Sequence, residues 1–294
     1  MSIVVGVDGS AVSAAALRWA AQEAAVRGDS LWIVHVRAPG RSRIPFGDGP
    51  LMEFDDAAHY ATQLLQEAAR IARAEAPDID IDVQGVTGQV ATTLLEAAEE
   101  AALLVVGRSG HGTLGSIFLG SVSVRLAAHA SCPVAIVPDV SDSNSAHMVV
   151  GIAVETPGVR AVLSFALDEA ARRSCRLTVV AAYSIPFTEA IRRDPSVYGP
   201  YDPVTHSVTA SSVAALIKHV RQDRHHGVDV DTMVVGEDPA GAITTTGHGA
   251  QLTVVGSRGH GTVTGPALGS VSQAVLRHAT HPVVVVPMVE SHLE

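Results

Sequence analysis

A long internal repeat constrains the fold of this chain more than any other feature. Residues 105–138 and 254–287 align without a gap, and 18 of the 34 paired positions are identical. The offset between the copies is 149 residues, about half of the 294-residue chain. A period of this length has the size of a domain rather than of a solenoid unit. We therefore predict two related domains, residues 1–140 and 146–294, joined by the polar segment SDSNSA.

Each copy of the repeat carries the same glycine pattern, which reads Gly-x-x-Gly, nine residues, Gly-Ser. The pattern falls on Gly107, Gly110, Gly120 and Ser121 in the first copy and on Gly256, Gly259, Gly269 and Ser270 in the second. A continuous apolar run precedes it both times, so a strand is expected to run into the loop and a helix to begin near the third glycine. Free backbone N–H groups at such a helix N-terminus commonly hold phosphate. A tight strand-to-helix connection without a ligand is the alternative.

Apolar runs and helical patterns alternate through each half. In the first half we predict strands over residues 3–7, 31–36, 79–86, 102–106 and 134–137, with helices after Ser10 and over 57–75, 91–100 and 120–130. Residues 79–86 alternate in the pattern of a half-buried strand. Strands that alternate with helices indicate right-handed crossovers and a parallel sheet. The second half repeats this order, although β-branched residues and glycines weaken the helical preference of the segment after Pro239.

Composition excludes several classes of protein. The formal net charge of −10 argues against a cationic surface for nucleic acid or anionic membranes, so neither is expected as a partner. No apolar run approaches the length of a membrane span, and the first residues lack the pattern of a signal peptide. We therefore predict a cytoplasmic protein. Cys132 and Cys175 show no ligand spacing and are expected to be ordinary buried or half-buried thiols.

The chain lacks the signatures of the common phosphate-binding enzymes. GxxxxGK[ST] is absent, GxGxxG does not follow the first strand, and Lys218 is the only lysine. P-loop NTPases and dinucleotide dehydrogenases are therefore poor interpretations. No carboxylate pair, Ser/His/Asp set or HExxH motif presents itself, so we assign no catalytic residue and no metal ligand.

Together with GVDGS at residues 6–10 and HASCPV at residues 129–134, the glycine pattern resembles the universal stress protein family, in the tandem two-domain form of mycobacteria and their relatives. The resemblance covers nearly the whole chain. It implies an α/β fold of two tandem open parallel five-stranded sheets, each in the order 3-2-1-4-5 with helices on both faces, related to the HUP class of nucleotide-binding proteins. It also implies the ATP-binding branch of the family.

The resemblance implies the same kind of site in each half. In the first half, the adenosine would lie beside Gly6, Asp8 and Val36, and the ribose and phosphates beside Gly107, Arg108, Ser109, Gly110, His111, Gly112, Thr113, Gly120, Ser121, Val122 and Ser123. The counterparts in the second half are Gly151, Ala182, Gly256, Ser257, Arg258, Gly259, His260, Gly261, Thr262, Gly269, Ser270, Val271 and Ser272. Asp8 has a second interpretation as a turn or cap residue. The histidines and arginines of the loops have one as solvent-exposed side chains.

These residues favour a nucleotide-binding stress or regulatory module whose ligand is ATP, with or without magnesium. A slow ATPase or an adenylyl-transferring enzyme of the same fold class is one alternative, and a nucleotide-free dimerisation scaffold is another. The resemblance further implies a homodimer.

The two sites are expected to be unequal. Aligning Gly6 with Gly151 places Ala153 opposite Asp8, so the second half lacks the acidic side chain next to the adenosine. A lost hydrogen bond weakens binding, and we therefore predict that the first half binds nucleotide more tightly.

Overall fold

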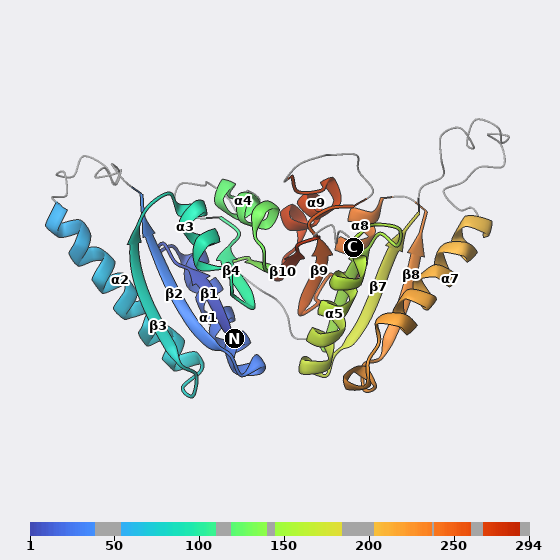
Figure 1. The fold of residues 1–294 in the computed structure, drawn as a ribbon, viewed down its shortest axis with the longest axis horizontal. Helices are drawn as coiled ribbons and strands as arrows, with labels where there is room; N and C mark the ends of the chain where they lie inside the picture. The colour runs from blue at the N-terminus through green and yellow to red at the C-terminus, as the bar shows by residue number, and fades with distance from the viewer. Residues whose placement is uncertain are drawn as a thin grey trace, which may run out of the picture. The chain divides into compact units, whose positions relative to one another are not determined.

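The computed structural model describes residues 1–38, 54–109, 119–139, 145–183, 203–236, 238–259 and 267–288 (Figure 1). The chain separates into two compact units, Met1–Val140 and Ser141–Glu294, which we call unit one and unit two. Each unit is an open parallel sheet with helices on both faces. The predicted fold class is confirmed.

Unit one has the strand order β3-β2-β1-β4-β5, which is the predicted order. Helices α1 and α2 pack together on one face of its sheet, and α3 and α4 pack together on the other. Its described elements are β1 (Ser2–Gly6), α1 (Ala11–Arg27), β2 (Ser30–Arg37), α2 (Phe54–Glu75), β3 (Ile81–Thr87), α3 (Val90–Ala97), β4 (Leu103–Gly107), α4 (Ser121–His129) and β5 (Val134–Val137).

Unit two repeats this topology in the order β8-β7-β6-β9-β10. Helices α5 and α7 share one face, and α8 and α9 share the other. Its described elements are β6 (His147–Ile152), α5 (Val159–Arg173), β7 (Arg176–Ala182), α7 (Pro203–Val220), the 3-10 turn η1 (Asp223–His225), β8 (Val230–Val235), α8 (Pro239–Thr246), β9 (Leu252–Gly256), α9 (Ser270–His278) and β10 (Val283–Val286).

The burial of four strands follows from the sequence. Strands β4, β5, β9 and β10 are continuous apolar runs, and their residues are buried except for Gly107. This pattern is typical of parallel strands that are covered on both faces. Helix α1 begins where predicted, because the Ser10 side chain accepts a hydrogen bond from the Ser13 N–H. It ends at Gly28, which has φ +70°.

One expectation about an individual element was wrong. The segment predicted to be a half-buried strand is β3, and its residues 82–85 are exposed, although β3 pairs with β2 along its whole length. The segment after Pro239 forms a helix of 8 residues, as long as α3. The Asp238 side chain caps this helix by accepting from the Gly241 N–H, and Ile243 is buried. Capping and packing thus outweigh the weak propensity.

The strand ends show how closely the two units match. A Cβ atom added to Gly6 would lie 3.0 Å from Leu94 Cδ1, and one added to Gly151 would lie 2.3 Å from Ile243 Cδ1. Leu94 and Ile243 are 149 residues apart, the offset of the repeat (243 − 94). Both glycines therefore let a helix, α3 or α8, pack directly on the end of the strand.

Both cysteines are free and buried, as predicted. Burial raises the pKa of the Cys132 thiol to about 11 and also raises that of Cys175. Such thiols are unreactive at neutral pH. Of the helices in the described ranges, none has the length and apolar composition that crossing a bilayer requires.

Candidate functional site

In each unit the strand order reverses at the carboxyl edge of the sheet, and we use the word crevice for this place only. In unit one the chain moves outward from β1 to β2 and β3 and then returns to place β4 on the other side of β1. Ligands of open α/β sheets bind at such a reversal of strand order, outside the carboxyl ends of the strands. Gly6 ends β1 and Gly107 ends β4, so both lie at this edge.

Helix α4 is tied to the end of β4 by a set of short hydrogen bonds. The Gly120 N–H donates to the carbonyl oxygen of Arg108 at 2.8 Å, and the Ser123 hydroxyl donates to that of Gly107 at 2.9 Å. The Arg108 N–H in turn donates to Val137 O at 2.8 Å. These bonds fix the helix N-terminus beside the crevice.

Unit two repeats these bonds with equivalent residues. The Gly269 N–H donates to Ser257 O at 2.9 Å, the Ser272 hydroxyl to Gly256 O at 2.6 Å, and the Ser257 N–H to Val286 O at 2.8 Å. The glycine pattern therefore encodes one local structure twice, even where the intervening residues differ.

Among the described residues, no side chain caps the N-terminus of α4 or of α9. Gly120 and Gly269 are the N-cap residues of α4 and α9, and neither has a side chain that could accept from the first-turn N–H groups. Ser121 and Ser270 are exposed, whereas Ser123 and Ser272 are buried. Uncapped N–H groups and the positive end of the helix dipole favour an anion at this place.

The structure gives Ser123 and Ser272 a positioning role. Their hydroxyl protons are donated to the strand-end carbonyls, so the hydroxyls hold the helix in place. The sequence could not assign this role, because a serine at the fourth position of Gly-Ser-Val-Ser also suits direct contact with phosphate.

Asp8 shapes the turn that leads from β1 into α1. Its Oδ1 atom accepts from the Ser10 N–H at 2.9 Å, and its own N–H donates to Ser13 Oγ at 3.3 Å. The turn interpretation of Asp8 is thus realised at the edge of the crevice. Unit two has Ala153 here, a longer connection over residues 153–158, and an α5 N-cap, Gly158, without a side-chain cap.

His35 is a residue of this edge that the sequence analysis missed. It is buried on β2, and its Nδ1–H donates to Val7 O at 2.8 Å, which fixes the chain just before Asp8. Val36 follows it, half-buried, and pairs with Val86. Ala182 pairs with Val235 in unit two. A lone histidine inside the apolar run LWIVHV was the available signal.

The ends of β4 and β9 are covered by different side chains. A Cβ atom added to Gly107 would lie 2.8 Å from Val12 Cγ1, whereas one added to Gly256 would lie 2.3 Å from Met288 Sδ. Met288 also packs on Gly158, and its N–H donates to Ser257 Oγ at 3.1 Å. Unit two thus covers the end of β9 with a residue from the segment after β10.

Arg108 is a half-buried cation at the start of the first loop. Burial lowers the pKa of its guanidinium group, and the carboxylate of Asp139 opposes that effect. Ser109, Arg258 and Gly259 are half-buried at equivalent or neighbouring positions. Predicted site residues that lie outside the described ranges are Gly110, His111, Gly112, Thr113, His260, Gly261 and Thr262.

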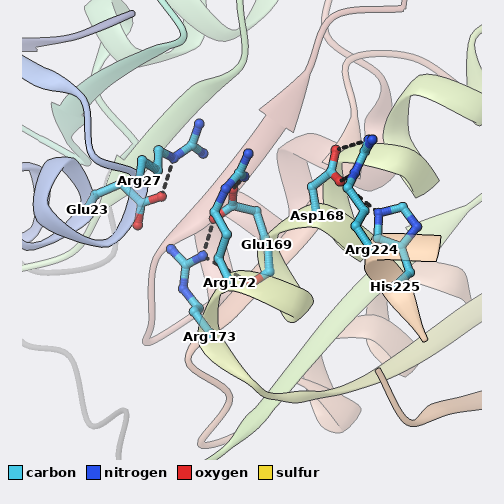
Figure 2. A network of polar contacts seen from close by, with 8 residues as sticks. All are labelled: Glu23, Arg27, Asp168, Glu169, Arg172, Arg173, Arg224 and His225. Carbon is cyan, nitrogen blue, oxygen red and sulfur yellow. Dashed lines mark hydrogen bonds and ion pairs between the residues drawn. The ribbon is translucent and has the colours of Figure 1, made fainter. Parts of the chain in front are cut away.

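A polar cluster between α5 and η1 holds a buried histidine of unit two. His225 is fully buried, and its Nε2 lies 2.7 Å from Asp168 Oδ1 (Figure 2). The Gln222 N–H donates to His225 Nδ1 at 3.1 Å, so Nε2 carries the proton and donates to Asp168. Burial raises the pKa of Asp168, but bonds from Arg224 and His225 outweigh this and lower it. Both ring nitrogens are engaged, so the cluster clamps η1 to α5.

A hollow of about 520 Å³ borders this cluster and is lined by Asp168, Ala171, Arg172 and Arg224. Arg224 pairs with Asp168, and Arg172 pairs with Glu169 (Figure 2). The charges of the hollow are therefore compensated internally. Among the described residues, no three His, Cys, Asp or Glu side chains form a group that could hold a metal ion.

The geometry defines a tandem α/β protein. In each unit, a glycine-rich sequence leads to a helix N-terminus without a side-chain cap, at the place where the strand order reverses. The model of the universal stress protein family matches residues 1–138 and 146–287. The chain belongs to the universal stress protein family.

Individual members of the family are similar to this chain over nearly its whole length. A universal stress protein of Mycolicibacterium smegmatis is 33% identical, covering 97% of this chain and 96% of the relative. One of Mycobacterium tuberculosis is 34% identical, covering 96% of each. The crystal structure of a universal stress protein from Archaeoglobus fulgidus superimposes with a TM-score of 0.70 at 20% identity, covering 99% of this chain and 97% of that one. The similarity to the structure from Archaeoglobus fulgidus supports the assignment of the fold.

Proposed function

We propose that the chain binds an adenine nucleotide, ATP with or without magnesium, in the crevice of unit one and serves as a nucleotide-dependent module of the stress response. The observation that carries this proposal is the uncapped N-terminus of α4, which the Gly120–Arg108 hydrogen bond holds at the carboxyl end of β4. Backbone N–H groups at such a place bind phosphate without a lysine, and Lys218 is the only lysine of the chain. Membership of the family supports the assignment to a stress response.

Each part of the crevice has a role in this proposal. The backbone N–H groups of Ser121 and Val122 and the exposed Ser121 hydroxyl receive the phosphates, while Arg108 offsets their charge. Asp8 and the backbone of Gly6 and Val36 adjoin the adenosine. The loop residues from Gly110 to Thr113 keep the role that the family resemblance implies.

Nucleotide analysis of the purified chain tests the proposal. After heat denaturation, chromatography of the supernatant is expected to show an adenine nucleotide, and nucleotide-free protein is expected to rebind ATP in a titration. The absence of both would favour the dimerisation scaffold. Turnover of ATP well above a no-protein blank would favour the enzyme, whereas retention of unhydrolysed ATP supports a binding module.

The two units are expected to form two classes of site, with unit one the tighter. Unit two lacks the acidic side chain of Asp8, and Met288 covers the end of β9. A hydrogen bond contributes about 0.5 to 1.5 kcal/mol, which corresponds to roughly a two- to tenfold difference in affinity. Calorimetric titration of nucleotide-free protein measures both classes.

Two substitutions of Asp8 make this test sharper. Asp8→Ala is expected to weaken the tighter class by roughly two- to tenfold. Asp8→Asn can still accept a hydrogen bond from the Ser10 N–H and keeps the turn. Its affinity for nucleotide therefore measures the contribution of the negative charge alone. Two indistinguishable sites in the unmodified chain would show that Ala153 and Met288 do not weaken unit two.

We further propose that two chains associate as a homodimer, which the family resemblance supports. Light scattering at tens of micromolar protein is expected to give a mass of twice the 30.4 kDa chain. A monomeric mass under these conditions would contradict this part of the proposal and leave nucleotide binding open.

A further inference from the structure

A buried histidine with an unsatisfied nitrogen lies at the amino-terminal edge of the sheet of unit two. His281 precedes β10 and is 3% exposed. Its Nε2 shares a hydrogen bond of 2.7 Å with the hydroxyl of Thr253 on β9, which is 1% exposed. Its Nδ1 is buried, and no described residue is its hydrogen-bond partner.

The ring is enclosed on the helix side as well. A Cβ atom added to Gly247, which ends α8, would lie 3.1 Å from His281 Cε1 and 3.0 Å from Thr253 Oγ1. The ring is therefore packed between the end of α8 and the strand β9. A proton added to Nδ1 would create a buried charge and a buried donor that has no acceptor among the described residues, and both are costly.

The charged groups around His281 add to this cost. His248, which follows α8, and His147, which begins β6, both lower the pKa of His281. His147 bonds to Thr178 Oγ1 at 2.9 Å, and it interacts with Arg176 on β7 and Asp231 on β8. Burial is the largest cause, and together these effects lower the pKa of His281 from 6.5 to about 4.

Unit one has no equivalent group. The repeat places Cys132 opposite His281 and Leu104 opposite Thr253, since both pairs are 149 residues apart. Cys132 and Leu104 are buried, and neither takes up a proton as the pH falls below 7. The two units should therefore respond differently to acid, although they share one fold.

We propose that His281 makes unit two an acid sensor, in which proton uptake by the ring opens the packing between the end of α8 and the strands β9 and β10. The proton acts at the amino-terminal edge of the sheet of unit two, whereas the crevice of that unit lies at the carboxyl edge of the same sheet. This function is independent of the proposed nucleotide binding, and it confines the acid response to one of two similar units.

The sign of the effect follows from the protons bound in each state. In the open state the His281 ring is exposed and binds a proton below pH 6.5, whereas in the closed state the buried ring stays neutral until about pH 4. Stability of the closed state is therefore complete above pH 6.5 and is lost as the pH falls toward 4. Each pH unit within this window raises the opening equilibrium constant about tenfold. From pH 7 to pH 5 the expected rise is roughly 30-fold.

Hydrogen–deuterium exchange on the full chain measures this opening. After correction for intrinsic exchange rates, amides of β9 and β10 should show the rise of roughly 30-fold between pH 7 and pH 5. Amides of β4 and β5, the equivalent strands of unit one, should show none. The interval from pH 7 to pH 5 lies above the usual pKa values of Asp and Glu, so their titration does not cause the expected rise. Equal pH dependence in the two units, or none in unit two, would overturn the proposal.

Three variants and a titration identify the group. His281→Gln keeps a partner for Thr253 without titrating, and His281→Cys installs the residue of unit one, so both should abolish the pH dependence of β9 and β10. His278→Gln, at the exposed end of α9, should leave it unchanged. Persistence of the dependence in His281→Gln would refute the role of His281. If both His281 variants fail to fold, a ring pKa of 6 or more for His281 in the unmodified chain, measured by NMR, would refute it equally.

Discussion

Replacing Gly120 by glutamate is expected to lower the affinity of unit one for ATP by at least about 100-fold. The side chain would place a carboxylate at the uncapped N-terminus of α4, where the phosphates are proposed to bind. Two like charges 4 Å apart repel by about 4 kcal/mol at an effective dielectric constant of 20, and that energy corresponds to roughly a 1000-fold loss of affinity. Fluorescence or calorimetric titration of nucleotide-free protein measures the change.

The variant should fold, because the backbone at this position suits any residue. Gly120 has φ −67° and ψ 146°, and an added Cβ atom would lie 3.3 Å from Arg108 O and 3.6 Å from Ser123 Oγ. Gly120→Gln has the same shape without the charge, so the difference between the two variants isolates electrostatic repulsion. A folded Gly120→Glu protein that keeps its affinity would show that the phosphates bind elsewhere.

The equivalent change in unit two provides the matched control. Gly269 is the N-cap of α9 in the same extended conformation, so Gly269→Glu should remove the weaker class of sites and spare the tighter one. Loss of the tighter class in this variant would reverse the assignment of the two units.

The sequence predicted the fold well because the repeated glycines encode backbone contacts that leave little freedom. Gly120 and Gly269 bond to the residue after each strand, and Gly6 and Gly151 admit a helix side chain against a strand end. The strand order came from the family resemblance, and the structure confirms it. The exposure of β3 was mispredicted, because an alternating pattern does not reveal whether a strand lies at an edge.

The candidate site was less predictable, because several of its contacts join residues far apart in the sequence. The bond from His35 to Val7 O crosses from one strand to the next, and Met288 reaches Gly256 from the segment after β10. Ser123 illustrates a different limit, since its type suits both phosphate contact and attachment to Gly107. Only the geometry identifies which bond the hydroxyl proton makes.

Replacing Gly151 by valine is expected to destabilise unit two by about 2 kcal/mol, because overpacking a well-packed core typically costs 1 to 3 kcal/mol. The added Cβ atom would lie 2.3 Å from Ile243 Cδ1 and 3.5 Å from Val255 Cγ1. Without this overlap the change would be favourable, since valine suits a strand better than glycine does. The sign of the effect therefore tests the packing of α8 on β6.

Urea denaturation followed by circular dichroism measures this effect, and the midpoint should fall by about 1 M for an m-value near 2 kcal/mol/M. A second substitution, Ile243→Ala, removes the atoms that clash. It should cost stability in the unmodified chain, because it leaves a cavity, but it should cost less in the Gly151→Val background, where the valine fills that space. The coupling energy between the two changes is expected to be favourable by about 1 kcal/mol. Strictly additive effects would mean that Gly151 and Ile243 do not touch, and the close contact of α8 with the end of β6 would then be wrong.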